Sequence, residues 1–106
     1  MTSPSTNYFA RVEGGDLRIY NKTYGVPKKI WETNTNSNEF CHLAVQDDGN
    51  LVLYSPTIKG KNENPKWASD TYGKDKNPRL EMQDDGNLVL YSSHNHPLWA
   101  SNTNGH

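Results

Sequence analysis

Two short stretches of the chain carry the same hydrogen-bonding side chains at every second position. The first set is Gln46, Asp48, Asn50, Val52 and Tyr54, and the second is Gln83, Asp85, Asn87, Val89 and Tyr91. A carboxylate accepts hydrogen bonds, an amide both donates and accepts, and a phenol does either. A sugar presents adjacent hydroxyls that need such partners at fixed spacing, and the valine offers an apolar patch to its C–H face. The spacing therefore favours carbohydrate binding at both stretches.

Neither set contains the groups that a hydrolytic enzyme needs. No side chain in either set is a nucleophile with an adjacent base, and a glycosidase requires two carboxylates that face each other across a cleft. Apart from the aspartates of the two turns, the sequence offers no such pair. We therefore expect a binding protein that has no catalytic activity and uses no cofactor.

Two features suggest a metal ion, but the sequence argues against both. The Asp-Asp-Gly-Asn turns resemble part of a calcium loop, yet neither copy has the glutamate required at the twelfth position. His94 and His96 flank Asn95 in a turn-forming segment, and no third ligand is identifiable. We expect no metal site.

The composition indicates a single folded domain that spans residues 1–106. Only 32% of the residues are hydrophobic, but three Trp, six Tyr and two Phe are more aromatic residues than a disordered chain carries. The net charge of -1 disfavours nucleic-acid binding, which needs a basic face. No apolar run approaches the roughly 20 residues of a membrane span, so we expect no membrane insertion.

The N-terminus and the cysteine content bear on where the protein acts. The segment from Met1 to Asn7 is polar and contains no apolar signal-peptide core. Cys41 is the only cysteine, so no disulfide can form within the chain. We expect a cytoplasmic protein or one secreted without a leader, and both alternatives stay open at this point.

The two polar sets belong to an internal repeat. Residues 46–55 recur unchanged at 83–92, and residues 16–20 are a degraded copy. A tryptophan motif follows each copy, and the three motifs begin at Trp31, Trp67 and Trp99. The chain thus contains three repeats, approximately residues 8–35, 40–71 and 79–103. Units this short must share one hydrophobic core.

Each intact copy predicts a β-hairpin, because Asp-Gly lies between alternating apolar residues. A loop of three residues, Asp47 to Gly49 with the glycine left-handed, pairs Gln46 with Asn50. A two-residue loop would mix polar and apolar side chains on both faces. With the longer loop the inward residues are Leu43, Val45, Leu51 and Leu53 in one copy, and Leu80, Met82, Leu88 and Leu90 in the other. The polar sets then lie on the outward face.

The degraded copy fits the same scheme only in part. Its expected inward residues are Phe9, Leu17 and Ile19, with Arg11 breaking the pattern, and its expected outward residues are Val12, Asp16, Arg18 and Tyr20. The three tryptophans hold equivalent positions, so their rings would meet on a pseudo-threefold axis and fill the core. We expect an all-β fold with pseudo-threefold symmetry around this tryptophan core.

The intact sets resemble the mannose-binding signature Gln-x-Asp-x-Asn-x-Val-x-Tyr of the monocot, or bulb-type, lectins. The segment from Trp67 to Tyr91 is similar to the lily-type lectins of fish skin mucus. The resemblance implies a β-prism II fold with three four-stranded antiparallel sheets. It also implies calcium-independent binding of D-mannose and of high-mannose glycans or glycoproteins. Asp and Asn would then contact the 2-hydroxyl, Gln the 3-hydroxyl and Tyr the 4-hydroxyl, with Val against the sugar ring.

The degraded copy departs from this signature. At the five signature positions it carries Val12, Gly14, Asp16, Arg18 and Tyr20, so that only the tyrosine is retained. Arg18 would place a bulky cation where the sugar ring should lie. We expect no mannose binding at this copy.

The resemblance has consequences for assembly as well. It implies a homodimer formed by exchange of the C-terminal strand, here the segment from Leu98 to Thr103. Cys41 resembles one half of the family's disulfide, but its partner position is not a cysteine. Only Met1 to Arg11 precede the first repeat, so the first sheet is expected to be short of a strand that a partner chain would supply.

A different class of function is the alternative at this point. A protein-interaction module would keep the prism but use its surface for a protein partner, with little or no sugar binding. The two identical polar sets argue against this alternative.

Overall fold

The structure is a computed structural model that describes residues 1–35, 41–55, 65–74 and 76–106. All regular secondary structure in these residues is β-strand. The strands are β1 (Tyr8–Glu13), β2 (Asp16–Asn21), β3 (Lys28–Glu32), β4 (His42–Val45), β5 (Leu51–Tyr54), β6 (Pro65–Ala68), β7 (Arg79–Met82), β8 (Leu88–Tyr91) and β9 (Pro97–Ala100). No helix in this part of the chain is long and apolar enough to cross a membrane.

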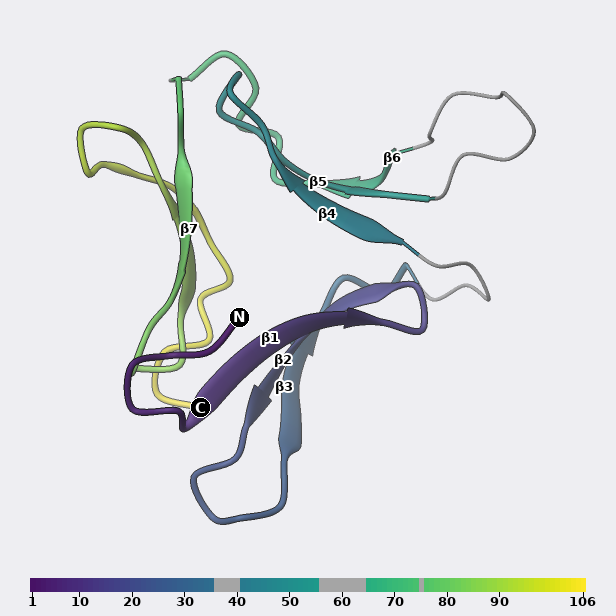
Figure 1. Ribbon diagram of the computed structural model, residues 1–106, viewed down its shortest axis with the longest axis vertical. Coiled ribbons are helices and arrows are strands. Elements are labelled where there is room, and N and C mark those ends of the chain that lie inside the picture. Colours follow the sequence, from purple (N-terminus) through teal and green to yellow (C-terminus); the bar gives the residue numbers. More distant parts are fainter. Residues whose placement is uncertain (36–40, 56–64, 75) are drawn as a thin grey trace.

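The strands form three antiparallel sheets, one for each repeat, with the orders β1-β2-β3, β4-β5-β6 and β7-β8-β9. Figure 1 shows the sheets as the three sides of a prism. The expected all-β prism is therefore confirmed. Each sheet has three strands within the described residues, whereas the resemblance implied four.

The N-terminal segment extends the first sheet by a single bridge. Thr2 pairs with Phe9, the Ser3 amide donates to the Tyr8 carbonyl at 2.9 Å, and the Ala10 amide donates to the Met1 carbonyl at 2.9 Å. These bonds occupy part of the outer edge of β1, which otherwise presents unpaired backbone groups. The chain's own N-terminus therefore lies where a partner's strand was expected.

The hairpins of the second and third repeats have the predicted register. Val45 pairs with Leu51, and the Gln46 amide donates to the Asn50 carbonyl at 2.9 Å. Gly49 closes the loop with a φ of 93°, and Gly86 does so in the third repeat with a φ of 92°. Because L-residues rarely adopt this left-handed conformation, a glycine at this place fixes the three-residue loop.

The first hairpin differs from its prediction by one residue. Glu13 pairs with Asp16, so the turn consists of only Gly14 and Gly15, whose φ angles are 59° and 80°. Two left-handed residues make a tight two-residue turn, which double glycine favours. The shorter loop shifts one strand by one position and exchanges its two faces.

This shift corrects the expected faces of β1. Ala10, rather than Phe9, is buried and pairs with Ile19. Val12 packs against the core, whereas it was expected outside. Phe9 lies outward, where its ring stacks on Tyr20 with a centroid separation of 5.0 Å.

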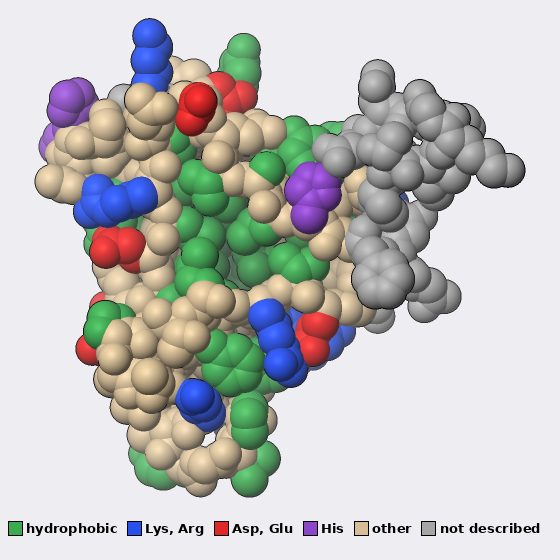
Figure 2. Space-filling model, viewed as in Figure 1, with side chains coloured by type: hydrophobic (Ala, Val, Ile, Leu, Met, Phe, Trp, Pro, Cys, Tyr) green, Lys and Arg blue, Asp and Glu red, His purple; other side chains and the backbone are tan. Residues whose placement is uncertain are grey.

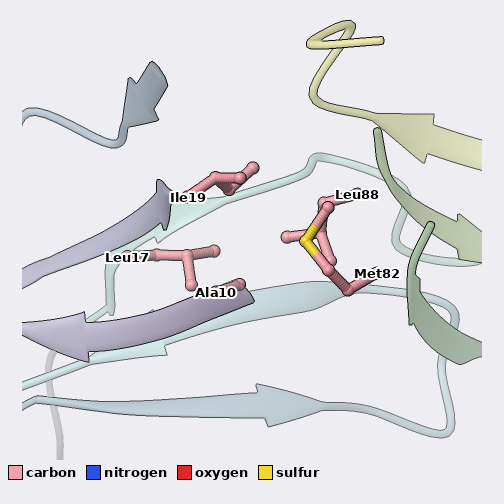
Figure 3. Packing of buried hydrophobic residues seen from close by; sticks show 5 residues of the cluster. All are labelled: Ala10, Leu17, Ile19, Met82 and Leu88. Carbon is pink, nitrogen blue, oxygen red and sulfur yellow. The ribbon is translucent and has the colours of Figure 1, made fainter. Parts of the chain in front are cut away.

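The centre of the prism is filled by aliphatic side chains from facing sheets. The fully buried leucines and isoleucine are Leu17, Ile19, Leu51, Leu53, Leu88 and Leu90. Figure 3 shows Leu17 and Ile19 of the first sheet opposite Met82 and Leu88 of the third. In the space-filling view, hydrophobic side chains gather between the three sheets (Figure 2). Val45, expected inside, is exposed at the end of β4.

The three tryptophans meet as predicted. Their ring centroids are 5.2–5.9 Å apart and all three pairs make edge contacts, the arrangement that aromatic quadrupoles favour. All three rings are only partly buried, so the aliphatic cluster rather than the tryptophans forms the fully buried centre. The C-terminal residue is held against the first sheet, because Tyr8 Oη and Asn21 Nδ2 each donate to the His106 carbonyl at 3.0 Å.

The fully buried leucines are the positions where the fold is expected to be most sensitive to substitution. Leu53 is completely buried between Leu43 and Trp67. Leu53→Ala is expected to lower the free energy of unfolding by about 2–5 kcal/mol, because it removes buried contacts and leaves a cavity. Val26 is 81% exposed and provides the control. Val26→Ala should change the free energy of unfolding by less than about 0.5 kcal/mol. Urea denaturation measures both, and equal effects would contradict the placement of Leu53.

Candidate carbohydrate-binding sites

The glutamine and tyrosine of each intact set are joined on the outward face of their sheet. Gln46 Nε2 donates to the hydroxyl oxygen of Tyr54, and Gln83 Nε2 donates to that of Tyr91 at 2.5 Å. In both copies this leaves the glutamine carbonyl oxygen and the phenol proton for a further partner.

The asparagine of each intact set is held by one atom only. Asn50 Oδ1 accepts hydrogen bonds from Ser69 Oγ at 3.1 Å and from the Thr71 amide at 3.3 Å. Asn87 Oδ1 accepts the equivalent bonds from Ser101 and Thr103 at 3.2 and 3.4 Å. The amide nitrogens have no hydrogen-bond partner among the described residues. Each asparagine therefore keeps two side-chain N–H donors that are not used within the described residues.

The aspartate is held against the backbone of the same asparagine. Asp48 Oδ1 accepts from the Asn50 amide at 2.9 Å, and Asp85 Oδ1 accepts from the Asn87 amide at 2.9 Å. Such a bond from an aspartate to the backbone two residues later is an Asx turn, which fixes the carboxylate above the loop. The second carboxylate oxygen remains available as an acceptor. In both copies the aspartate is thus held against the asparagine, and the glutamine is held against the tyrosine, whereas a joint role of these residues in sugar binding stays a prediction.

The valines are less accessible than expected. Val52 and Val89 share the outward face with the polar set, yet each is only 3% exposed. The apolar patch available to a sugar ring is therefore small, and hydrogen bonds dominate the chemistry of these sites.

Sequence analysis did not identify the residues that position these sets. Thr71 Oγ1 donates to the Gly49 carbonyl at 2.6 Å and shares a 2.7 Å hydrogen bond with Ser69 Oγ. Asp70, between them, is left-handed with a φ of 60°, which turns both hydroxyls toward the hairpin. This Ser-x-Thr pattern follows the tryptophan of both intact repeats. The sequence therefore contains the residues that position the asparagine, although the polar sets alone do not indicate their role.

The tyrosines are also supported from the neighbouring strand. The ring of His42 stacks on Tyr54 with a centroid separation of 5.5 Å. In the third repeat the Arg79 guanidinium lies 4.8 Å from the centre of the Tyr91 ring. Both neighbours pack against the tyrosine ring and restrict its rotation, which leaves the hydroxyl beside the glutamine.

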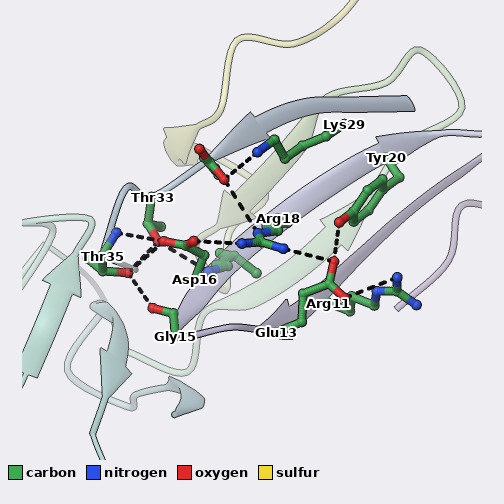
Figure 4. Close-up of polar contacts among 11 residues, drawn as sticks. Arg11, Glu13, Gly15, Asp16, Arg18, Tyr20, Lys29, Thr33 and Thr35 are labelled. Atoms are coloured by element: carbon green, nitrogen blue, oxygen red, sulfur yellow. Dashed lines mark hydrogen bonds and ion pairs between the residues drawn. The ribbon is translucent and has the colours of Figure 1, made fainter. Parts of the chain in front are cut away.

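The first repeat retains more of the polar set than the signature positions indicated. Because the first turn is one residue shorter, Glu13 rather than Val12 lies in the place of the glutamine and accepts a hydrogen bond from Tyr20. Asp16 takes the place of the asparagine and accepts from the Thr35 amide at 2.6 Å (Figure 4). No residue of the two-glycine turn replaces the loop aspartate.

Arg18 occupies the centre of this set. Its guanidinium lies 3.4 Å from Glu13 Oε1, 3.1 Å from Asp16 Oδ2 and 3.4 Å from Glu32 Oε2. The side chain is 22% exposed, and it stands at the valine position of the intact sets. The arginine therefore pairs with these acidic groups, and the loss of mannose binding at the first repeat stays a prediction.

Hydrogen bonding shifts the ionisation of Glu13. The hydroxyl of Tyr20, helped by Arg11 and Arg18, lowers the pKa of the Glu13 carboxyl below its ordinary value of 4.5. A lowered pKa in the folded state means that the ionised form stabilises the fold above the ordinary value. This contribution is lost as the pH falls through the lowered pKa.

Metal binding finds no support in these sites. Within the described ranges, no group of three or more His, Cys, Asp or Glu side chains lies close enough to hold a metal ion.

No protein-family model matches the chain. The mannose-specific lectin of Narcissus pseudonarcissus is 59% identical over 34 residues, which are 31% of this chain and 31% of the relative. The match therefore spans about a third of that curated relative's length.

Two solved structures are similar over nearly the whole chain. A structure of monomeric monocot mannose-binding lectins from Gastrodia elata is 34% identical, with a TM-score of 0.76 over 92% of this chain and 82% of that one. The Japanese Marasmius oreades lectin is 28% identical, with a TM-score of 0.78 over 97% of this chain and 79% of that one.

The three-sided prism and these neighbours define a lectin fold of the β-prism II class. The sequence identity to the Gastrodia structure and the share of both chains that is aligned also establish the family. The chain belongs to the monocot mannose-binding, or bulb-type, lectins. Proteins of this family bind carbohydrates and are not enzymes.

The first-repeat cluster gives a pH-dependent prediction. Glu13→Gln is expected to lower the melting temperature at neutral pH, because glutamine cannot pair with the charge of Arg18. The difference from the wild type should shrink below pH 4.5, where the wild-type carboxyl takes up a proton. Thermal unfolding across this range measures the effect, with Glu81→Gln as a control for the lost negative charge. A difference that stays constant with pH would contradict the assignment.

Proposed function

We propose that the chain is a lectin that binds mannose and mannose-containing glycans at two sites, one in the second repeat and one in the third. The sites consist of Gln46, Asp48, Asn50, Val52 and Tyr54, and of Gln83, Asp85, Asn87, Val89 and Tyr91. One observation carries the proposal. In both copies the asparagine is anchored through Oδ1, its N–H donors have no partner among the described residues, and its backbone amide holds the carboxylate of the aspartate two residues earlier.

A sugar hydroxyl fits this pair because it donates one hydrogen bond and accepts others. The asparagine Nδ2 donates to the hydroxyl oxygen while the aspartate accepts the hydroxyl proton. The glutamine and the tyrosine, held together on the same face, serve the neighbouring hydroxyls. By the resemblance to the family, the first pair takes the axial 2-hydroxyl that distinguishes mannose from glucose.

The relatives support mannose as the ligand. The Narcissus protein is named a mannose-specific lectin, and the Gastrodia proteins are named mannose-binding. The 34 residues aligned with the Narcissus lectin cover only about a third of each chain. The proposed ligand specificity therefore rests on the geometry of this chain's own sites as well.

A shallow, polar site predicts weak binding of a single sugar. Its hydrogen bonds replace bonds to water, and a dissociation constant of about 1 mM, or about −4 kcal/mol, is expected for mannose. Two such sites on one chain raise the avidity for a surface that displays many glycans. A homodimer would double them, but exchange of the C-terminal strand stays a prediction. In this structure β9 pairs with β8 of its own chain.

Replacing each asparagine by aspartate tests the proposal without disturbing the anchor. A carboxylate keeps the acceptor for the serine and the threonine, and Asp16 already occupies this place in the first repeat. It removes the N–H donors and adds a second negative charge beside Asp48 or Asp85. Asn50→Asp and Asn87→Asp should each leave one binding site per chain, and affinity at the altered site should fall about tenfold or more.

Isothermal titration with methyl α-mannoside measures these stoichiometries. The double variant should remain folded and bind no mannoside in the millimolar range, although its melting temperature is expected to fall because neither new carboxylate has an arginine beside it, as Asp16 has. Unchanged binding by the folded double variant would refute the site assignment. A wild-type chain that binds no mannoside but retains a protein partner would favour the interaction-module alternative.

Calcium independence is tested separately. Asp48 and Asp85 already accept hydrogen bonds from the backbone within their loops, and neither loop supplies the glutamate of a calcium site. Retention on mannan-agarose should therefore be the same in EDTA and in excess calcium, and free mannose should elute the protein. Loss of retention in EDTA that added calcium restores would overturn this part of the proposal.

A further inference from the structure

The two candidate sugar sites are identical in sequence but differ in what lies beside them. Next to Asp48, a pocket of about 820 Å³ is lined by Asp47, Asp48, Tyr72, Gly73, Lys76 and Asn77. Gly73, Lys76 and Asn77 line the pocket from the connection between β6 and β7. This connection runs beside the β4–β5 turn (Figure 1). Backbone bonds hold it there: Gly73 donates to the Asp48 carbonyl at 2.7 Å and Asn77 donates to the Asp47 carbonyl at 3.3 Å.

The equivalent place in the third repeat is covered by the N-terminal segment. The Ser5 amide donates to Asp84 Oδ1 at 2.8 Å, and Asp84 corresponds to Asp47. The ring of Tyr8 lies against Gly86, so closely that a Cβ there would come within 2.8 Å of it. The C-terminal backbone follows the turn as in the second repeat, with Gly105 donating to the Asp85 carbonyl at 3.0 Å. The N-terminus thus occupies space that stays open beside Asp48.

We propose that the pocket beside Asp48 binds the second sugar residue of a mannose-containing oligosaccharide whose terminal mannose lies in the second-repeat site. This inference rests on the proposed function of that site. Asp48 belongs to both the site and the pocket, so a ligand held by its carboxylate borders the pocket directly. The volume lies within the range of roughly 300–1,000 Å³ that small-ligand pockets occupy.

Tyr72 supplies the main contact for this second sugar. This residue is 74% exposed, so one face of its ring is accessible to a ligand in the pocket. A tyrosine ring presents a flat apolar face for the C–H groups of a sugar, and its hydroxyl remains in water. The Asp47 carboxylate and the Asn77 amide, on the pocket wall, are hydrogen-bonding groups for the sugar hydroxyls. At the position that corresponds to Tyr72, the third repeat carries Asn104.

The test uses a chain in which only the second-repeat site remains, carrying Asn87→Asp. Isothermal titration compares methyl α-mannoside with an α-linked mannotriose. Adding Tyr72→Ala is expected to weaken mannotriose binding about three- to tenfold, the usual worth of one aromatic contact, while methyl α-mannoside binding changes less than about twofold. Tyr72→Phe keeps the ring and should keep the preference for mannotriose. Tyr24→Ala is the matched control, since Tyr24 is 93% exposed in the β2–β3 connection.

The outcomes separate this inference from the proposed function. If the single-site chain binds methyl α-mannoside but Tyr72→Ala leaves mannotriose affinity unchanged, the inference is wrong and the mannose site stands. If Tyr72→Ala weakens both ligands equally, Tyr72 belongs to the primary site and the separate pocket is refuted. If neither ligand binds the folded chain, the proposed function itself fails. The reciprocal chain, with Asn50→Asp, should show no effect of Tyr72→Ala on either ligand.

Discussion

One hydrogen bond recurs in every repeat and links the fold to the site. A threonine at the end of the third strand donates its hydroxyl to the carbonyl of the glycine that closes the hairpin: Thr35 to Gly15, Thr71 to Gly49 and Thr103 to Gly86. The bond joins the hairpin loop to the segment that follows the third strand. In the intact repeats the adjacent serine and backbone amide then hold the asparagine by its oxygen. The residues that join the hairpin loop to the third strand therefore also fix the orientation of the asparagine side chain.

The first repeat shows that this scaffold tolerates a change of chemistry on its surface. The hydrogen bond from Thr35 to Gly15 is present, but Asp16 and Arg18 replace the asparagine and the valine of the intact repeats. Asp16 is almost fully buried, and a buried carboxylate requires a charged or hydrogen-bonding partner. Arg18 supplies it at 3.1 Å and thereby fills the face that the intact repeats leave open. The two substitutions are coupled, because an acid at the asparagine position calls for a cation, and that cation occupies the place of a ligand.

Local sequence was sufficient to predict some elements and not others. The Asp-Asp-Gly turns fixed the registers of the second and third hairpins, since only a three-residue loop separates apolar from polar faces. The first hairpin was predicted by analogy with those copies, whereas its turn chemistry depends on Gly14 and Gly15. A one-residue difference in loop length exchanged the faces of β1, which displaced Phe9 and brought Glu13 to the site. The pocket beside Tyr72 could not be predicted, because it depends on how distant segments lie against the turns.

Identical motifs need not have identical specificity when their binding energy is small. A few hydrogen bonds that replace bonds to water give a monosaccharide little net affinity, so groups just outside the motif contribute a large share of the total for a longer glycan. Around the third-repeat turn that space holds Ser5 and Tyr8, and the same N-terminal segment bridges the edge of the first sheet through Thr2. Around the second-repeat turn it holds an exposed ring and an open pocket. The N-terminal segment, which shares no motif with the binding sites, thereby makes two copies of one sequence chemically unequal.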